Sequence, residues 1–537
     1  MKNLAKNILF FTLATLSHSA FAQKNVSEQV NVVRSYKPIL AEALRINTNP
    51  EIKNDLVQIE PLNYQKIIFG LDSLTKTSPV EAEKMKSESI TKIYPAYLRL
   101  AGGNYANSLV DFYLSNLRAK DYQTGLAYNH RAASNSKVAN MNNSTNNLSA
   151  WAKKMNSSNT LSAAFNYNRG VSNYYGYNHD SLIFSKDTTR QQYDIISLQT
   201  SLVSNIDNTS KLKYDVFFNA YSLNDAWSTK ENRMITGGNF SYDVYDFKIG
   251  LDASQSEKNA ISYKNNLMEF SPNVSLKEGE GTLTIGLISF IESGDKSSFH
   301  AYPNVKYTYE WKAASLVAFA GMNGKMHKNS LYQFAQENPF IGSVNILNTN
   351  EKLTLYAGAR GSIGTKTAYL LNVNLSQTEN DAYFVVDQSD MRKYTIIYDG
   401  KNASAFHLSA EMTHQSNSKL RLFGKLNIHS YQTDTLREAY HRPTYEINAG
   451  ATYAIADKFR LQLDMIAYSS MKAPDYRLGT INNIDGGTDL NLAIDYKYSK
   501  IISVFTQFNN ILNYQRARYL YYNNYGFQAM LGLSFNF

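Results

Sequence analysis

The end of the chain, from Phe527 to Phe537, has a strongly apolar residue at every second position. Successive side chains of a β-strand point to opposite faces, so this segment is predicted to be a strand with one apolar face. In lipid every backbone group must be paired within the protein, so a membrane-spanning sheet has to close on itself. The residues predicted on the apolar face are Phe527, Ala529, Leu531, Leu533, Phe535 and Phe537.

The same period of two recurs from about residue 93 to the end of the chain, in segments of roughly ten residues. Clear examples are 161–167, 212–220, 459–467 and 489–498, where the charged residues share one face and the apolar residues share the other. An apolar outer band around a polar, charged lumen is the pattern of a transmembrane β-barrel. A soluble antiparallel β-protein also alternates, so the connections between strands have to separate the two interpretations.

The predicted connections alternate between tight turns and longer polar loops. The tight turns are Ala456–Asp457, Tyr245–Asp246, Tyr498–Lys500 and Glu278–Gly281. The longer stretches are 132–145, 175–192, 327–350, 431–441, 471–487 and 514–525. This asymmetry is typical of outer-membrane barrels, whose tight turns lie in the periplasm. Counting from Ile93 predicts an all-β antiparallel barrel of about 22 strands, within a range of 18–22, with residues 381–399 as a hairpin above the membrane.

The N-terminus reads as an export signal. Lys2 and Lys6 precede the apolar run Ile8–Leu16, and Ala20-Phe21-Ala22 forms a small-x-small cleavage site before Gln23. No later run of about 18 apolar residues predicts a membrane helix. We therefore expect a signal peptide at 1–22, a short irregular periplasmic or lumenal segment at 23–92, and a barrel at 93–537 in the outer membrane of a Gram-negative bacterium.

The composition narrows the functional classes. The chain has 40 Tyr but only 3 Trp, and the two membrane interfaces of a barrel are one place where Tyr is favoured. With no Cys, the chain has no disulfides, no thiolate metal sites and no lipoprotein anchor. The net charge of +9 is spread along the chain, so we expect no nucleic-acid partner. The basic residues are expected either to contact outer-membrane lipid headgroups or to line a pore that favours anions.

No constellation of catalytic residues stands out, so we predict that the protein is not an enzyme and has no cofactor or metal. His429 falls on the inner face of its strand, where a polar lumen residue is more frequent than a ligand or base. Asn482, Asn483, Asp485 and Asp489 surround two glycines, but their spacing misses the EF-hand pattern, and an ordinary loop is favoured.

The stretch Phe505–Asn513, followed by Tyr525–Phe537, resembles the last two strands of TonB-dependent receptors, which also have 22-stranded barrels. Val30–Pro38 resembles the start of short TonB-receptor-like proteins of Bacteroidota. The resemblance implies uptake driven through TonB from the inner membrane. It also implies insertion by the barrel assembly machinery, for which the final strand is the expected contact, through Phe527, Leu531, Leu533, Phe535 and Phe537.

The resemblance departs from the family at the plug, because segment 23–92 is too short for a full plug domain. A barrel of this size has to be occluded by residues 23–92, by loops folded inward, or by a partner protein. Val30, Val32 and Val33 are candidates for pairing with a TonB strand, although an ordinary structural strand is the favoured alternative. We predict a porin-like or receptor-like transport protein for a solute. The alternative is a structural or assembly subunit of an outer-membrane complex whose lumen a partner blocks.

Overall fold

The computed structural model describes residues 93–537, apart from 118, 206–207, 209, 259–260, 296, 343–344 and 457. The predictions for the signal peptide at 1–22 and for segment 23–92 lie outside the described residues.

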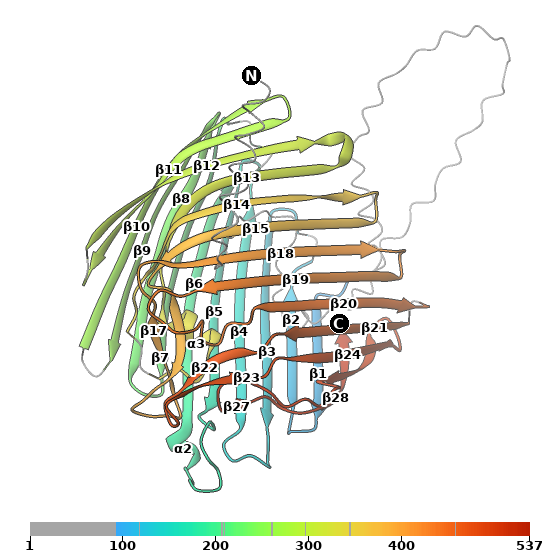
Figure 1. The fold of residues 1–537 in the computed structure, drawn as a ribbon. Coiled ribbons are helices and arrows are strands. Elements are labelled where there is room, and N and C mark those ends of the chain that lie inside the picture. The colour runs from blue at the N-terminus through green and yellow to red at the C-terminus, as the bar shows by residue number, and fades with distance from the viewer. Residues whose placement is uncertain are drawn as a thin grey trace, which may run out of the picture.

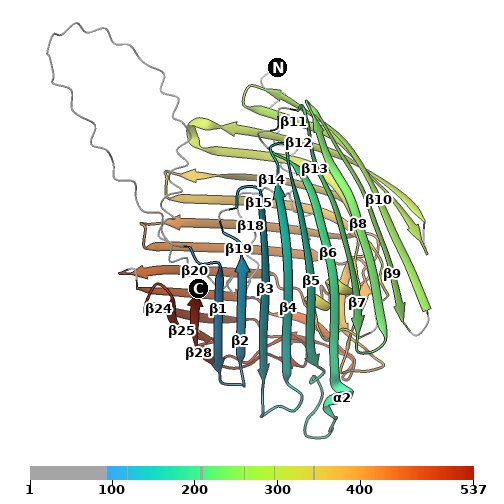
Figure 2. The same ribbon diagram turned by 180° about the vertical axis from the view of Figure 1, so that it is seen from behind.

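One antiparallel sheet of 22 strands forms the wall of a barrel (Figures 1 and 2). Its first strands are β1 (Ala96–Gly103), β2 (Ser108–Ser115), β3 (Tyr122–Ser134), β4 (Asn142–Met155), β5 (Asn159–Asn173), β6 (Arg190–Ser204), β7 (Leu212–Asp225), β8 (Thr229–Tyr242), β9 (Tyr245–Lys258), β10 (Ile261–Glu278) and β11 (Gly281–Gly294). The others are β12 (Ser298–Trp311), β13 (Leu316–His327), β14 (Thr349–Ile363), β15 (Thr367–Glu379), β18 (Ala403–Gln415), β19 (Leu420–Gln432), β20 (Tyr445–Ile455), β21 (Phe459–Tyr468), β24 (Gly487–Lys497), β25 (Ile502–Asn509) and β28 (Gln528–Asn536).

The last strand closes the sheet against the first. β1 pairs with both β2 and β28, and Leu100 lies opposite Leu533 in the register. Ala96 and Phe537 exchange two backbone hydrogen bonds, of 2.9 and 3.0 Å. No edge of the sheet is therefore left unpaired, as a sheet in lipid requires. The predicted all-β closed barrel is confirmed, and so is its predicted count of about 22 strands.

The two faces of the final strand divide as the alternation predicts. Leu531 and Leu533 are exposed on the outside of the barrel, whereas Met530 and Ser534 are buried on its inner side. Exposed outer residues on other strands include Phe165, Ile249 and Phe459. An apolar outer surface on a closed sheet is the arrangement of a membrane barrel.

The connections divide the barrel into a turn end, where Ala96 and Phe537 lie, and a loop end opposite it. Tight turns occupy the turn end, and each of the six long polar stretches predicted from the sequence contains a connection at the other end, although 132–145 is reduced to a loop at 135–141. One tight turn was misplaced: Tyr245 already begins β9, and the turn residues are Asp243 and Val244. Asp243 has a φ of +56°, a conformation that Asp tolerates in two-residue hairpin turns.

Three small hairpins lie in the loops, outside the wall. They are β16 (Ala382–Val386) with β17 (Tyr394–Tyr398), β22 (Met471–Asp475) with β23 (Thr480–Ile484), and β26 (Ala517–Tyr519) with β27 (Tyr522–Asn523). Short helices are α2 (Lys186–Thr189), α3 (Leu331–Glu337) and the 3-10 turn η3 (Lys312–Ala314). In the described part of the chain, no helix has the length and apolar character needed to cross a bilayer.

Candidate functional site

Parts of six loops at the loop end pack against one another in two adjoining apolar clusters, and we call these loops the lid. Its segments are 174–189, 328–348, 380–402, 433–444, 469–486 and 510–527. Figure 1 shows α3, β17, β22, β23 and β27 drawn within the ring of wall strands. The predicted hairpin at 381–399 is confirmed as β16 and β17, but it is part of the lid, and every residue of β16 is buried.

The lid has an apolar core that reaches across the mouth of the barrel. Ile341 and Tyr394 are fully buried at its centre, and they come from different loops. The core includes Leu223 and Ile195, which point inward from the wall strands β7 and β6. Of the three obstructions considered from the sequence, inward-folded loops are the one that the described residues show.

Tyrosine hydroxyls connect the loops to one another. The hydroxyls of Tyr174 and Tyr193 both donate to the backbone oxygen of Ile341, at 3.2 and 3.0 Å. Tyr394 donates to the Leu520 oxygen and Tyr519 to the Glu337 oxygen, each at 2.9 Å. These bonds satisfy carbonyl groups that irregular buried loops leave without a backbone partner. Part of the Tyr excess in the composition is therefore explained by the lid and not by the membrane interfaces alone.

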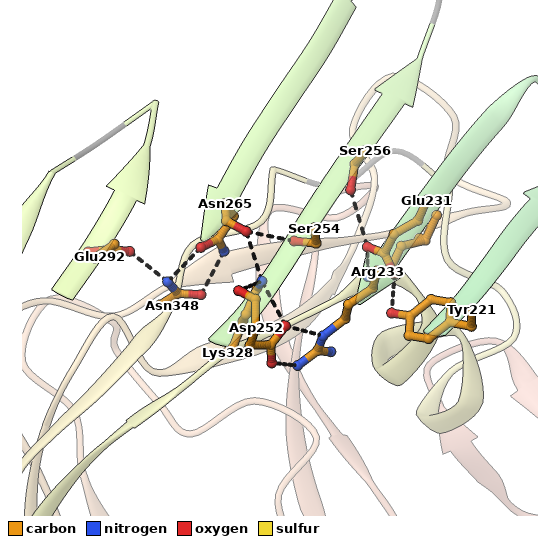
Figure 3. Close-up of polar contacts among 11 residues, drawn as sticks. Tyr221, Glu231, Arg233, Asp252, Ser254, Ser256, Asn265, Glu292, Lys328 and Asn348 are labelled. Atoms are coloured by element: carbon orange, nitrogen blue, oxygen red, sulfur yellow. Dashed lines mark hydrogen bonds and ion pairs between the residues drawn. The ribbon is translucent and has the colours of Figure 1, made fainter. Parts of the chain in front are cut away.

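The segment 328–348 is fixed to the barrel wall at the start of α3 (Figure 3). Glu231, a fully buried carboxylate on β8, accepts hydrogen bonds from the backbone N–H groups of Leu331 and Tyr332 at 2.8 and 3.2 Å. It also accepts bonds from the hydroxyls of Tyr221 and Ser256. An acidic group at a helix N-terminus pairs with free N–H donors, so Glu231 supplies from the wall what the loop lacks.

A second contact lies beside it. Lys328 Nζ donates to the backbone oxygen of Asp252 at 2.6 Å, to its Oδ1 at 2.9 Å, and to the Asn265 oxygen at 2.8 Å. Arg233 also holds Asp252 through two hydrogen bonds. Burial lowers the pKa of Lys328 to about 8 despite the Asp252 carboxylate. Glu231, Arg233, Asp252 and Lys328 together carry two charges of each sign, so this anchor has no net charge.

Arg442 connects two segments of the lid to each other. Its guanidinium forms a two-pronged pair with Asp381, donates to the Ala382 oxygen at 2.8 Å, and lies 3.9 Å from the centre of the Tyr383 ring. A planar guanidinium suits a carboxylate and an aromatic face at the same time. This contact joins segment 433–444 to the start of hairpin β16–β17.

His441, next to Arg442, touches three other lid segments. Its Nδ1 lies 2.9 Å from the Phe384 oxygen, and its Nε2 lies 3.4 Å from both the Leu520 nitrogen and the Tyr394 hydroxyl. Its backbone N–H donates to the Lys472 oxygen. With its proton on Nδ1, the neutral ring donates to the Phe384 oxygen, and its Nε2 accepts from the Leu520 N–H, while the Tyr394 hydroxyl donates to the Leu520 oxygen. Burial lowers the pKa of His441 to about 4, so the ring is neutral at neutral pH.

Below the lid, the wall carries charged groups in pairs. Lys248 lies 2.8 Å from Glu269, Arg131 lies 3.1 Å from Asp111, and Lys425 is paired with Glu411. These residues are on the inner face, as the alternation predicted. The lumen wall therefore contains paired charges of both signs.

The residues singled out from the sequence are placed as follows. Val30, Val32 and Val33 lie outside the described residues. His429 is on the inner face, stacked on His407 with their Nδ1 atoms 3.1 Å apart. Of the four residues compared with a calcium loop, Asn482 donates to Asp475, and Asp489 forms an ion pair with Arg516. These two residues therefore have separate partners. Among the described residues, no group of three or more His, Cys, Asp or Glu is arranged to hold a metal.

The residues of the final strand, Phe527, Leu531, Leu533, Phe535 and Phe537, belong to β28 and its flanks, at the seam of the barrel. Their expected role in assembly stays a prediction. Sequence reasoning missed Glu231, Lys328 and His441. The only local signal was Ser330, whose hydroxyl caps α3 by accepting from the Gln333 N–H.

Sequence comparison alone identifies nothing, because no protein-family model and no curated protein matches the chain. Solved structures do match. The FrpB iron transporter from Neisseria meningitidis has a TM-score of 0.65 at 10% identity, over 83% of this chain and 82% of that one. The ferric-catecholate import receptor Fiu from E. coli K12 has a TM-score of 0.61 at 8% identity, over 83% and 82%. The copper transporter OprC has a TM-score of 0.57 at 11% identity, over 82% and 80%.

The fold is therefore that of a TonB-dependent receptor-like outer-membrane barrel, as the resemblance in the final strands implied. The structural neighbours are transporters and receptors and not enzymes. At identities near 10% the likeness concerns the barrel fold, and it leaves the solute and the driving force open.

Proposed function

We propose that this protein is an outer-membrane transport protein that passes a solute through its barrel when the lid opens. The observation that carries the proposal is a closed wall of 22 strands whose polar lumen is crossed at the mouth by the protein's own loops. Barrels of this strand number are wide and need an occluding element. Neighbours described as iron and copper transporters support the assignment.

The proposal includes the route to the membrane. The signal peptide at 1–22 exports the chain, and the apolar face of the final strand, ending at Phe537, is presented to the barrel assembly machinery. Segment 23–92 faces the periplasm or enters the lumen from the turn end, where β1 begins. Within it, Val30, Val32 and Val33 are proposed as the strand that pairs with TonB, by edge addition.

The test is single-channel recording from the purified full chain in planar bilayers, with and without hairpin β16–β17. Its removal is feasible because Asn380 N–H donates to the Gly400 oxygen at 3.2 Å, so a short Gly-Ser linker joins the two ends. We expect the natural chain to be closed with rare openings and the shortened chain to show a large, steady conductance. Replacing the exposed turn 178–183, which lies outside the lid core, is the matched control and should leave the mouth closed.

Silence of the shortened chain, even after removal of residues 23–92 as well, would overturn the transport proposal. Together with a partner that purifies with the barrel, that outcome would favour the structural or assembly role. Loss of solute uptake when Val30, Val32 and Val33 are replaced, with the barrel intact, would support TonB coupling.

A further inference from the structure

Two hollows lie next to each other on the outer face of the wall, across strands β7 to β12, which run side by side in Figure 2. The first, of about 380 Å³, is nearer the loop end, and its lining combines apolar side chains such as Met234 with the cation Lys264 and the amides of Gln255 and Asn266. The second, of about 690 Å³, lies farther from the loop end, toward the middle of the wall strands, and is lined mainly by apolar side chains. Both hollows are outside the lumen, so what they bind does not depend on transport of a solute through the barrel.

The strand register shows why the hollows exist. Gly238, Ile249, Phe270 and Ser289 form one row across β8 to β11, in which Ser289 leaves a low point between larger side chains and the Phe240 ring fills the space over Gly238. The apolar rims of the deeper hollow are Phe240, Ile249, Phe270, Ile291 and Phe299, and four of these are well exposed on the outer surface.

The two hollows are continuous along the strands. On β10, Lys264 and Asn266 line the first hollow, and the next outward residues, Met268 and Phe270, line the second. Outward residues two positions apart are separated by roughly 7 Å along a strand, so the polar and apolar linings adjoin. The groove is thus polar and cationic toward the loop end and apolar toward the middle of the wall.

We propose that this groove retains one phosphate-bearing membrane lipid from the leaflet at the loop end. The lipid phosphate binds at Lys264 beside the amides of Gln255 and Asn266, and an acyl chain lies in the apolar hollow over Ser289. The polarity of the groove changes in the same direction as that of a lipid, from head to tail. A cation at the membrane surface attracts an anionic headgroup, and each buried methylene of the chain adds to the affinity.

The test is native mass spectrometry of the full chain in mild detergent, titrated with phosphatidylglycerol or with phosphatidylcholine of the same chain length. We expect one retained phosphatidylglycerol per barrel and weaker retention of phosphatidylcholine. Lys264→Gln should weaken phosphatidylglycerol binding about fivefold, the factor expected for one basic residue near the surface. Ser289→Leu raises the floor of the apolar hollow and should reduce retention of both lipids.

The control is Ala451→Leu, which adds the same bulk to the outer face of β20, opposite Leu463 and far from the groove in strand order. Ser289→Leu keeps the outer face apolar, whereas a side chain at Gly238 would meet the Phe240 ring, so Ser289 is the safer position. Unchanged lipid binding in both Lys264→Gln and Ser289→Leu would overturn the proposal. A change from dimer to monomer in Ser289→Leu, with lipid binding unchanged, would instead assign the groove to a second copy of this chain.

Discussion

His441 links the stability of the lid to pH through its charge. The ring is buried among Tyr394 and Tyr519, with the cations Arg442 and Arg518 nearby, so a second proton on Nε2 would face the Leu520 N–H and positive charge. The pKa is about 4 in the fold and about 6.5 in an unfolded chain. Between pH 4 and pH 6.5 the unfolded lid therefore binds more protons than the folded lid. The stability of the folded lid decreases as the pH falls from 6.5 through 4.

We predict that acid opens the lid before it unfolds the wall, with a loss on the order of 3 kcal/mol of lid stability below pH 4. Hydrogen exchange of the lid segments between pH 7 and pH 4, corrected for intrinsic rates, measures it. His441→Asn keeps a donor for the Phe384 oxygen and should flatten this pH dependence. His179→Asn, at an exposed position in segment 174–189, should leave the dependence as it is.

Asp252 is the residue on which the wall anchor of segment 328–348 depends most, since it pairs with both Lys328 and Arg233. Asp252→Asn would leave two largely buried cations with one carboxylate fewer, a change that typically costs about 3–5 kcal/mol. We expect faster hydrogen exchange in segment 328–348 while the wall strands stay protected. Glu280→Gln, which breaks the exposed pair with Lys312 at the turn end, should leave the stability nearly unchanged, because water screens exposed ion pairs. Equal effects of the two variants would contradict this assignment.

The sequence predicted some of these residues and not others for a physical reason. The inward position of His429 follows from alternation within one strand, which is a local property. Glu231 meets Leu331 and Tyr332 a hundred residues later in the chain, and His441 meets Phe384 and Leu520 across three loops. Such contacts exist only after the loops have packed, so no spacing in the sequence reports them.

Among the elements, the wall strands are joined by a repeated pairing of glycine with an aromatic ring. An aromatic side chain lies over the glycine opposite it on the neighbouring strand, so a Cβ on that glycine would collide with the ring. The pairs are Gly125 with Trp151, Gly237 with Phe217, Gly321 with Tyr356, Gly358 with Phe319, and Gly532 with Phe505. The bare backbone lets the ring lie flat, which fixes the register between the strands.

Gly358→Ala should destabilise the barrel by about 1–3 kcal/mol, because the added Cβ collides with the Phe319 ring and lies 2.5 Å from the Leu371 oxygen. The temperature at which the unheated barrel loses its fast migration in a denaturing gel measures the effect. Gly424→Ala is the control, since a Cβ there meets nothing within 4 Å. If both variants lose their fast migration at the same temperature as the natural chain, the ring contact does not contribute to the stability of the wall.

Strands were predictable from the sequence to the extent that their contacts are regular. The period of two identified the wall, and the long polar stretches identified the loops. The β22–β23 and β26–β27 hairpins were not predicted, because each is short and depends on the lid around it. Hairpin β16–β17 was predicted from two short apolar runs within 381–399 and was expected above the membrane, whereas it packs inward, because an apolar run does not say what covers it.

In the whole molecule, the wall and the lid are stabilised in different ways. The wall is a closed ladder in which β1 and β28 complete the hydrogen bonding, so it has no edge from which to fray. The lid depends on contacts between loops, such as Arg442 with Asp381, and its attachment to the wall rests on a few polar contacts such as Lys328 with Asp252. Elements with irregular backbone and few anchors open at lower free energy than regular sheet.

The three Trp residues allow this difference to be measured. Trp227 lies at the edge of the lid, with Lys393 Nζ of segment 380–402 at 4.5 Å from its ring. Trp151 lies in the wall over Gly125, and Trp311 lies at the turn end. Two variants that keep one Trp each, with Phe at the other two positions, therefore report separately on lid and wall.

We predict that Trp227 fluorescence changes on heating at a temperature on the order of 5 °C or more below that of Trp151. The far-ultraviolet signal of the sheet should follow Trp151. Between the two transitions the barrel should conduct ions in a planar bilayer, because the wall persists while the lid no longer crosses the mouth. A single shared transition would mean that lid and wall unfold as one cooperative unit, and a solute could then pass only by a movement of loops too small to expose Trp227.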